Sequence, residues 1–273
     1  MSRATPPVVL VFAGTDPTGG AGLSADVLTL ASLGCHAAAA VTAVTAQDTS
    51  GIKQYSCVDT ELVIAQARAV LEDMPVAAFK IGMLGSSAVA TAVAGVVEDY
   101  PDIPLIVDPV QSSGRGDPLT DDMLDGALRS LIIPQATLIT PNSLEARKLA
   151  PSGDTLDACA QELMSLGSEF VLVTGTHETT PQVIHRLYGN MRLLETFVFE
   201  RLPGSYHGSG CTLASACAAS LAHGLDPVNA VGEALQYTWE TLKYSFRFGM
   251  GQHLPNRLYW AWEMDEPETG GEE

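Results

Sequence analysis

The sequence predicts an α/β fold in which helices cover both faces of a mostly parallel central sheet, with an antiparallel hairpin at one edge. Short apolar runs of strand length alternate with longer segments of helical periodicity, and glycine-rich turns follow several of the runs. No repeat or change in composition divides the 273 residues. We therefore expect a single domain over residues 1–262 and an acidic, disordered tail over residues 263–273.

The first expected unit is a strand from Val8 to Ala13, a turn from Gly14 to Gly22, and a helix closed by Gly34. This order of strand, glycine-rich turn and helix is also found in dinucleotide-binding proteins. The turn, however, lacks both the dinucleotide fingerprint and the P-loop lysine. These absences argue against a nicotinamide cofactor.

A second strand is expected from Ala37 to Val44, followed by a polar loop from Thr45 to Gly51. Gln47 in this loop has two interpretations. It is either an ordinary surface residue or, because its amide both donates and accepts hydrogen bonds, a residue that recognises the edge of a heterocycle.

The alternation then continues through the middle of the chain. In open α/β sheets ligands bind beyond the carboxyl ends of the strands, which places Met83, Asp108 and Val110 at the functional edge. For Met83 a role in the core is the alternative. The expected elements are a helix from Thr60 to Met74, a strand from Ala77 to Ile81, an alanine-rich helix to about Tyr100, and strands at Leu105–Val107, Leu138–Thr140 and Phe170–Val173.

Asn142 and Glu145 open the helix that follows the strand at Leu138. Side chains three residues apart share a helix face, and two oxygen ligands suit a magnesium ion that keeps most of its waters. The alternative is that Asn142 caps the helix and Glu145 favours its first turn. The sequence leaves both open.

A small-residue turn from Ser205 to Gly210 joins a long apolar helix that we expect to begin near Cys211 and to end near Gly224. The first N–H groups of a helix lack internal partners and can bind phosphate oxygens. The alternative is a loop that merely starts a helix. We also expect the helix dipole to lower the pKa of the Cys211 thiol. The remaining elements are a hairpin around Gly189–Asn190 and a last helix from Pro227 to about Phe248.

Composition narrows the functional classes. A net charge of −18 argues against binding to nucleic acid. No apolar run is long enough to span a membrane, and the N-terminal segment does not read as a signal peptide, so we expect a cytoplasmic protein without a membrane partner. The five cysteines contain no C-x-x-C pair, which argues against a disulfide framework and a zinc site. The sequence does not decide the oligomeric state, for which a homodimer is one option.

Taken together, the motifs resemble the bacterial hydroxymethylpyrimidine/phosphomethylpyrimidine kinases of thiamine biosynthesis, members of the ribokinase-like superfamily with pyridoxal kinases as close relatives. The resemblance covers about residues 8 to 258. It rests on the ordered occurrence of Ala13-Gly14-Thr15-Asp16-Pro17-Thr18-Gly19-Gly20-Ala21-Gly22 with Asp26, Ala43-Val44-Thr45-Ala46-Gln47-Asp48-Thr49, Lys80-Ile81-Gly82-Met83-Leu84-Gly85, Val107-Asp108-Pro109-Val110, Thr140-Pro141-Asn142 with Glu145, and His207-Gly208-Ser209-Gly210-Cys211-Thr212.

The resemblance implies a ribokinase-like fold and an ATP- and Mg²⁺-dependent kinase acting on 4-amino-5-hydroxymethyl-2-methylpyrimidine, its monophosphate, or both. It implies that the anion hole is formed by Gly208, Ser209, Gly210 and Cys211, with Cys211 where many relatives have an aspartate base. Gln47 would read the pyrimidine, beside Gly14, Ala21, Asp26, Met83 and Val110. The Mg-ATP side would be served by Asp108, Asn142 and Glu145.

One departure from the family pattern concerns the nucleotide. Thr174 stands where these kinases usually have a lysine near the phosphates. Arg115, flanked by two glycines, is either a solvated surface residue or the cation that replaces this lysine. The alternatives to the pyrimidine kinase are a pyridoxal kinase of the same fold and a pyrimidine-binding homologue with reduced turnover.

Overall fold

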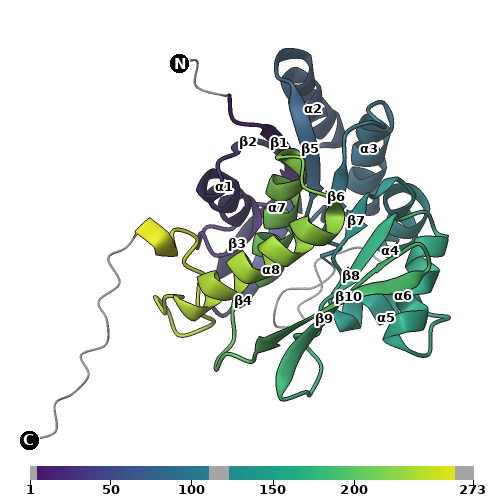
Figure 1. Cartoon of the computed structure of the whole chain (residues 1–273). Coiled ribbons are helices and arrows are strands. Elements are labelled where there is room, and N and C mark those ends of the chain that lie inside the picture. Colours follow the sequence, from purple (N-terminus) through teal and green to yellow (C-terminus); the bar gives the residue numbers. More distant parts are fainter. Residues whose placement is uncertain (1–4, 111–122, 262–273) are drawn as a thin grey trace, which may run out of the picture.

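The computed structural model describes residues 5–110 and 123–261 and contains a mostly parallel sheet of eight strands in the order β10-β9-β8-β7-β6-β5-β1-β2 (Figure 1). Within this sheet, β2, β1, β5, β6, β7 and β8 pair in parallel, whereas β8, β9 and β10 pair antiparallel at one edge. The predicted fold class is confirmed. The strands are β1 Val8–Ala13, β2 His36–Val41, β5 Val76–Ile81, β6 Leu105–Val107, β7 Leu138–Ile139, β8 Phe170–Val173, β9 Gln182–Gly189 and β10 Arg192–Glu200.

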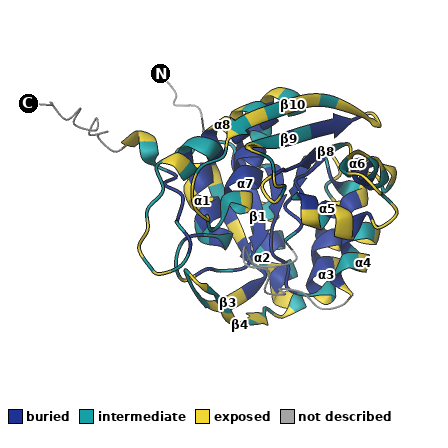
Figure 2. Cartoon of the chain, turned by 90° about the horizontal axis from the view of Figure 1, so that it is seen from below, coloured by how far each residue is buried: buried dark blue, intermediate teal, exposed yellow. Residues whose placement is uncertain are grey.

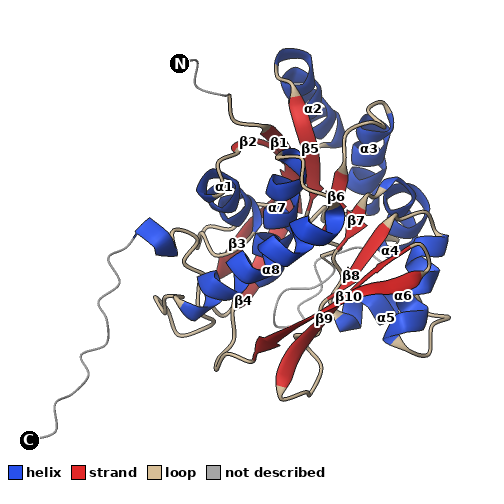
Figure 3. Ribbon diagram, in the orientation of Figure 1, coloured by secondary structure: helices blue, strands red, loops and turns tan. Residues whose placement is uncertain are grey.

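Alternating side chains of the central strand β1 supply two cores, because successive residues of a strand point to opposite faces. Leu10 and Phe12 join one hydrophobic cluster, and Val9 and Val11 join the other. Helices cover both faces (Figure 3). The face of the sheet to which Val9 points is covered by α1 Gly22–Ser32, α7 Ser209–Ala222 and α8 Pro227–Lys243. The face to which Leu10 points is covered by α2 Thr60–Asp73, α3 Ser87–Glu98, α4 Leu124–Ala127, α5 Ser143–Leu149 and α6 Leu156–Ser165.

Helix α7 is buried along most of its length, as its dark blue colour in Figure 2 shows. It packs against both α1 and α8 and reaches strands β1, β5 and β6. Its first residue is Ser209, two positions before the expected start. This central packing fixes the N-terminus of α7 at the carboxyl ends of the parallel strands.

The prediction of a loop from Thr45 to Gly51 is wrong. Strands β3 Ala43–Asp48 and β4 Gly51–Cys57 form a separate antiparallel hairpin. The expected second strand is interrupted at Thr42, whose hydroxyl donates to the Met83 carbonyl at 2.6 Å. The hairpin is polar because one of its sides is exposed to solvent. A polar segment can therefore be either an exposed strand or a loop, and polarity alone does not distinguish the two.

The last helix also ends earlier than expected. Helix α8 stops at Lys243, and Phe246 instead forms an antiparallel bridge with Leu254. Short 3₁₀ and π segments, Ile133–Gln135, Tyr259–Ala261 and Leu128–Ile132, add to the expected elements. The predicted tail at residues 263–273 lies outside the described residues. Within residues 5–110 and 123–261, no helix combines the length and apolar character needed to cross a bilayer.

Candidate active site

A cavity of about 500 Å³ opens where the parallel strands end. Gly14 follows β1, Met83 follows β5, Asp108 follows β6, and Thr174 follows β8, so the shared direction of the strands gathers these residues at one edge. The expected position of Met83, Asp108 and Val110 at this edge is confirmed. The predicted site residues that line the cavity are Gly14, Ala21, Gln47, Met83, Asp108, Val110, Asn142, Glu145, Thr174, Gly208, Ser209, Gly210 and Cys211.

Two predicted site residues are not placed at the cavity. Asp26 is fully buried in α1 and does not line it, because its carboxylate is engaged with the Lys80 ammonium at 2.9 Å and the Ser215 hydroxyl at 2.7 Å. We therefore correct the expectation that Asp26 contacts substrate. Its side chain supports the residues around the cavity instead. Arg115 lies outside the described residues.

Residues 208–211 at the N-terminus of α7 are the stretch for which the sequence predicts anion binding, and we call them the anion cradle. Gly208 caps the helix with φ 78°, a left-handed conformation that favours glycine. A Cβ atom there would stand 2.0 Å from the Gly20 carbonyl oxygen. Gly208 therefore lets two loops touch. The N–H groups of the first turn have no acceptor within the helix, and the residues that carry them line the cavity.

The expected low pKa of Cys211 is wrong. Burial raises the pKa of its thiol to about 12. The positive charge of Lys80 lowers this pKa, but the negative charges of Asp108 and Asp26 raise it again in part. The helix dipole is too weak to compensate for this loss of solvent. The neutral thiol interacts with the Asp108 carboxylate and partly counters the rise in the pKa of that carboxyl group. Cys211 is thus a neutral thiol at the cradle and not a thiolate.

Asp108 and Glu145 make one wall of the cavity strongly acidic. Burial raises the pKa of Asp108, partly offset by Lys80. Burial also raises the pKa of Glu145, and the charge of Asp108 adds to this effect. One buried oxygen of Asp108, Oδ2, has no hydrogen-bond partner among the described residues. A cation beside these carboxylates would relieve both the desolvation and the repulsion.

This wall fits a magnesium ion that reaches the protein through one or two carboxylates and completes its shell with water and phosphate oxygens. Within the described ranges no group of three or more His, Cys, Asp or Glu side chains forms a complete metal site. Asn142 fits the ion less well. Its Oδ1 accepts from the N–H groups of Leu144 and Glu145 at 2.9 and 3.0 Å, while Glu145 Oε2 accepts from the Asn142 N–H.

The capping alternative for Asn142 and Glu145 is therefore realised as a complete capping box. With Oδ1 engaged, the cap must open before that oxygen can bind a metal. The Asn142 amide N–H groups remain suited to a phosphate oxygen.

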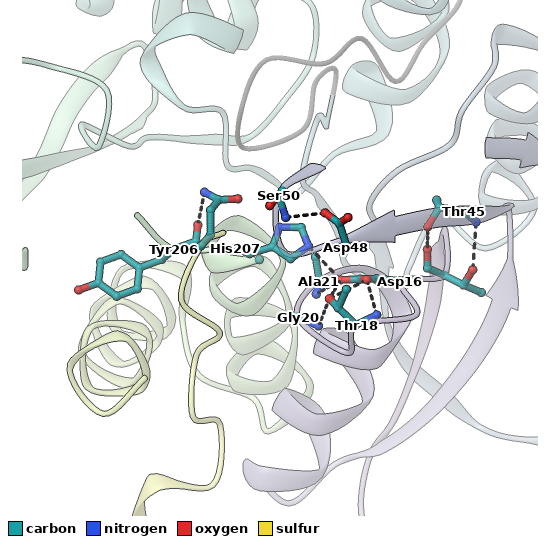
Figure 4. Close-up of polar contacts among 12 residues, drawn as sticks. Asp16, Thr18, Gly20, Ala21, Thr45, Asp48, Ser50, Tyr206 and His207 are labelled. Atoms are coloured by element: carbon teal, nitrogen blue, oxygen red, sulfur yellow. Dashed lines mark hydrogen bonds and ion pairs between the residues drawn. The ribbon is translucent and has the colours of Figure 1, made fainter. Parts of the chain in front are cut away.

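Asp16 is a site residue that the sequence analysis did not single out. Its carboxylate accepts from the Thr18 N–H and Ala21 N–H, each at 2.8 Å, and pairs with His207 Nε2 at 2.9 Å (Figure 4). Burial would raise the pKa of Asp16, but hydrogen bonds from His207, Gln47 and Thr18 hold it well below its usual range. The place of Asp16 in a glycine-rich turn could have marked it as a candidate site residue. Its pairing with His207, far away in the sequence, could not have been predicted.

Two cations near the cavity were also missed. Lys80 is fully buried in β5; burial alone would lower its pKa, but the charge of Asp26 raises it, so it stays protonated. Arg201 lines the cavity on the side of Thr174 and donates to the carbonyls of Thr176, Glu178 and Thr180 at 2.8–3.0 Å. Such pairings depend on tertiary contacts, and short sequence motifs do not reveal them.

Comparison with known proteins gives one consistent family. The model of the phosphomethylpyrimidine kinase family matches residues 16–256. A hydroxymethylpyrimidine/phosphomethylpyrimidine kinase of Mycobacterium bovis is 42% identical over 262 residues, covering 93% of this chain and 95% of the relative. The ADP complex of Bacillus subtilis pyridoxal kinase superimposes with a TM-score of 0.84 at 27% identity, covering 94% and 99% of the two chains. The phosphomethylpyrimidine kinase of Clostridium difficile superimposes with a TM-score of 0.74 at 32% identity, covering 86% and 98%.

Proposed function

Since this chain belongs to the phosphomethylpyrimidine kinase family, we propose that it transfers the terminal phosphoryl group of ATP to 4-amino-5-hydroxymethyl-2-methylpyrimidine or to its monophosphate. The observation that carries this proposal is the joint position of Gln47 and the anion cradle on one cavity. An amide that can pair with a heterocycle thereby faces the same space as N–H groups that can bind a phosphoryl group.

In this proposal the pyrimidine lies beside Gln47, with Gly14, Ala21, Met83 and Val110 around it. Its hydroxymethyl oxygen points to the cradle, where N–H groups of Gly208 to Cys211 stabilise negative charge on the transferred phosphoryl group. Phosphoryl transfer depends mainly on positioning and charge stabilisation and asks little of a base. A neutral Cys211 thiol is compatible with that demand, since it can orient the alcohol without first losing a proton.

The nucleotide would lie on the side of Asn142, Thr174 and Arg201. We propose Arg115 as a further phosphate ligand, on the basis of its sequence position. Asp108 and Glu145 would hold Mg²⁺, which supplies charge neutralisation between the phosphates when it is bound. The Asn142 side chain then contributes its amide N–H groups rather than its engaged oxygen.

A coupled assay that follows ADP release tests this function directly. We expect turnover with Mg-ATP and the pyrimidine alcohol, its monophosphate, or both. Turnover with pyridoxal alone would instead favour the second candidate, a pyridoxal kinase, which the likeness to the Bacillus subtilis enzyme supports. Binding of the pyrimidine without ADP release would indicate a homologue with reduced turnover.

Three wider expectations stay predictions. They are a single domain over residues 1–262, a cytoplasmic location, and a homodimer as one option for the assembly. Light scattering of the purified protein would determine the assembly, and fractionation of the source cells would determine the location.

A further inference from the structure

The chain after α8 returns to the rim of the cavity, and Arg257 is the residue of this segment whose side chain is inserted into the protein. The Gln252 N–H donates to the Thr49 carbonyl at 2.9 Å, at the turn of the β3–β4 hairpin. His253 forms a parallel bridge with Tyr206, next to the cradle. Four residues later the Arg257 side chain enters the protein, where only 3% of it is exposed. The C-terminal segment thus carries a guanidinium into the interior beneath the cavity.

Among the described residues, the Arg257 guanidinium has three hydrogen-bond acceptors, which lie in the cradle, directly after it, and in the loop that touches it. Its Nε donates to the Thr212 hydroxyl oxygen at 3.0 Å, in the first turn of α7. Its Nη2 donates to the Gly20 carbonyl at 2.6 Å and to the Gly208 carbonyl at 3.5 Å. Gly20 and Gly208 are the two residues whose backbones meet at the glycine cap. Arg257 therefore holds together the parts that give the cradle its shape.

Arg257 is not in direct ion-pair contact with a carboxylate of the part of the chain that the structure describes. The charges of Asp26 and Asp16 act on Arg257 without direct contact, and these carboxylates contact Lys80 and His207 instead. An arginine does not lose its proton in a protein, and a buried charge is costly unless an opposite charge balances it. A fixed positive charge therefore lies behind an anion-binding loop.

We propose that Arg257 is a positioning residue of the anion cradle, supplying positive charge behind it and fixing the contact between Gly208 and Gly20. The proposal rests on the proposed function, in which this cradle binds the transferred phosphoryl group. In that function the negative charge of the phosphoryl group would add to the charges of Asp26 and Asp16, which already act on Arg257. Arg257 does not line the cavity and acts through the backbone of Gly208 and through its field.

Three variants separate charge from packing. Arg257→Met keeps much of the side-chain length without charge, and Arg257→Lys keeps the charge without the fork of donors. Tyr237→Phe is the matched control, because the Tyr237 hydroxyl donates to the Arg257 carbonyl at 2.8 Å and so anchors the same segment. Circular dichroism melts identify the variants that fold.

We expect Arg257→Met to lower kcat by roughly 10–100-fold, as the loss of an outer-layer partner does at other sites, with KM for the pyrimidine changed by less than about 2-fold. Arg257→Lys should recover part of kcat, and Tyr237→Phe should keep kcat within about 2-fold of the parent. An unchanged kcat in Arg257→Met would overturn the proposal. So would an equal loss of kcat in Tyr237→Phe, or a Lys variant no better than Met.

A second measurement uses inorganic phosphate alone and needs no turnover. Phosphate should raise the Tm of the parent by mass action and raise that of Arg257→Met much less, with Arg257→Lys between them. Equal shifts in all three would overturn the proposal. If the parent releases no ADP with any of the alcohols, the proposed function fails, while the phosphate shifts still decide the role of Arg257. If Arg257→Met does not fold, the Lys variant carries both measurements.

Discussion

Asp16 and His207, 191 positions apart, meet at 2.9 Å between Oδ2 and Nε2 and join the two loops that border the cavity. Asp16 closes the first glycine-rich turn through the N–H groups of Thr18 and Ala21. His207 directly precedes the Gly208 cap of α7. The pair therefore links the turn after β1 to the anion cradle, so that a disturbance of one loop should reach the other.

The first prediction concerns pH. Because the pKa of Asp16 is lowered in the folded state, its ionised form stabilises the fold above the unfolded pKa of about 3.9, and this contribution is lost as pH falls below that value. Asp16→Asn should cost about 1–3 kcal/mol of unfolding free energy at pH 7 and progressively less below about pH 4. Urea titrations across pH measure this. Asp102→Asn, on an exposed turn, is the control, and a pH-independent loss in Asp16→Asn would contradict the assignment.

The second prediction concerns the pyrimidine. Gln47→Ala should weaken pyrimidine binding by about 1–3 kcal/mol, because truncation leaves polar groups of the ligand unpaired. Binding of ATP should hardly change, since Gln47 lies on β3, whereas Asn142 and Thr174 on the proposed nucleotide side follow β7 and β8. Calorimetry with each ligand makes the comparison. Equal losses for both ligands would mean that Gln47 supports the structure instead.

The third prediction concerns Cys211. With a thiol pKa of about 12, the native protein should show slow alkylation of Cys211 by iodoacetamide at pH 8, whereas the same peptide after denaturation should react as a free cysteine. Fragmentation of the labelled peptide in the mass spectrometer distinguishes Cys211 from Cys217, which lies six residues later, and from the other three cysteines. Cys211→Ala should retain stability and lose part of its turnover. Rapid native labelling at pH 8 would restore the thiolate interpretation.

The fourth prediction concerns the glycine cap. Gly208→Ala should destabilise the protein by about 1–3 kcal/mol, the cost of a strained left-handed residue, and should lower turnover because the new Cβ pushes Gly20 away. Gly95→Ala is the matched control: Gly95 lies within α3, and a Cβ there meets no atom within 4 Å. It should stabilise the protein by up to about 1 kcal/mol. Thermal melts and the coupled assay of both variants decide; a Gly208→Ala protein with parent turnover would exclude a role for the cap.

The fifth prediction concerns the buried ion pair of Lys80 and Asp26. Lys80→Met should cost about 3–5 kcal/mol, because it strands a buried carboxylate. Adding Asp26→Asn should recover much of the loss, since the amide needs no counter-ion and can still accept from Ser215. Lys53→Met, which breaks an exposed pair with Asp48, should leave the free energy of unfolding almost unchanged. Urea unfolding of the parent, Lys80→Met, Asp26→Asn and the double variant completes the cycle, and additive losses would argue against a coupled pair.

The sequence by itself determined the alternation of the main strands and helices, the parallel sheet, and the edge at which the candidate site residues gather. Buried strands such as Val8–Ala13 appear as short apolar runs, and helices repeat their apolar residues at a different period. The turns that line the cavity follow directly from where those strands end. Local signals also predicted the Asn142 cap as one of two alternatives, because a capping box is contained within four consecutive residues.

Only the tertiary structure decided which partner each polar side chain meets. The pKa of Cys211 depended on burial beside Asp108 rather than on the helix dipole, and Asp26 was drawn to Lys80 rather than to the cavity. Arg257, 45 positions beyond Thr212, reached the cradle only through the return of the C-terminal segment. Electrostatic free energies depend on distance and on the loss of solvent, and neither quantity is a local property of a sequence.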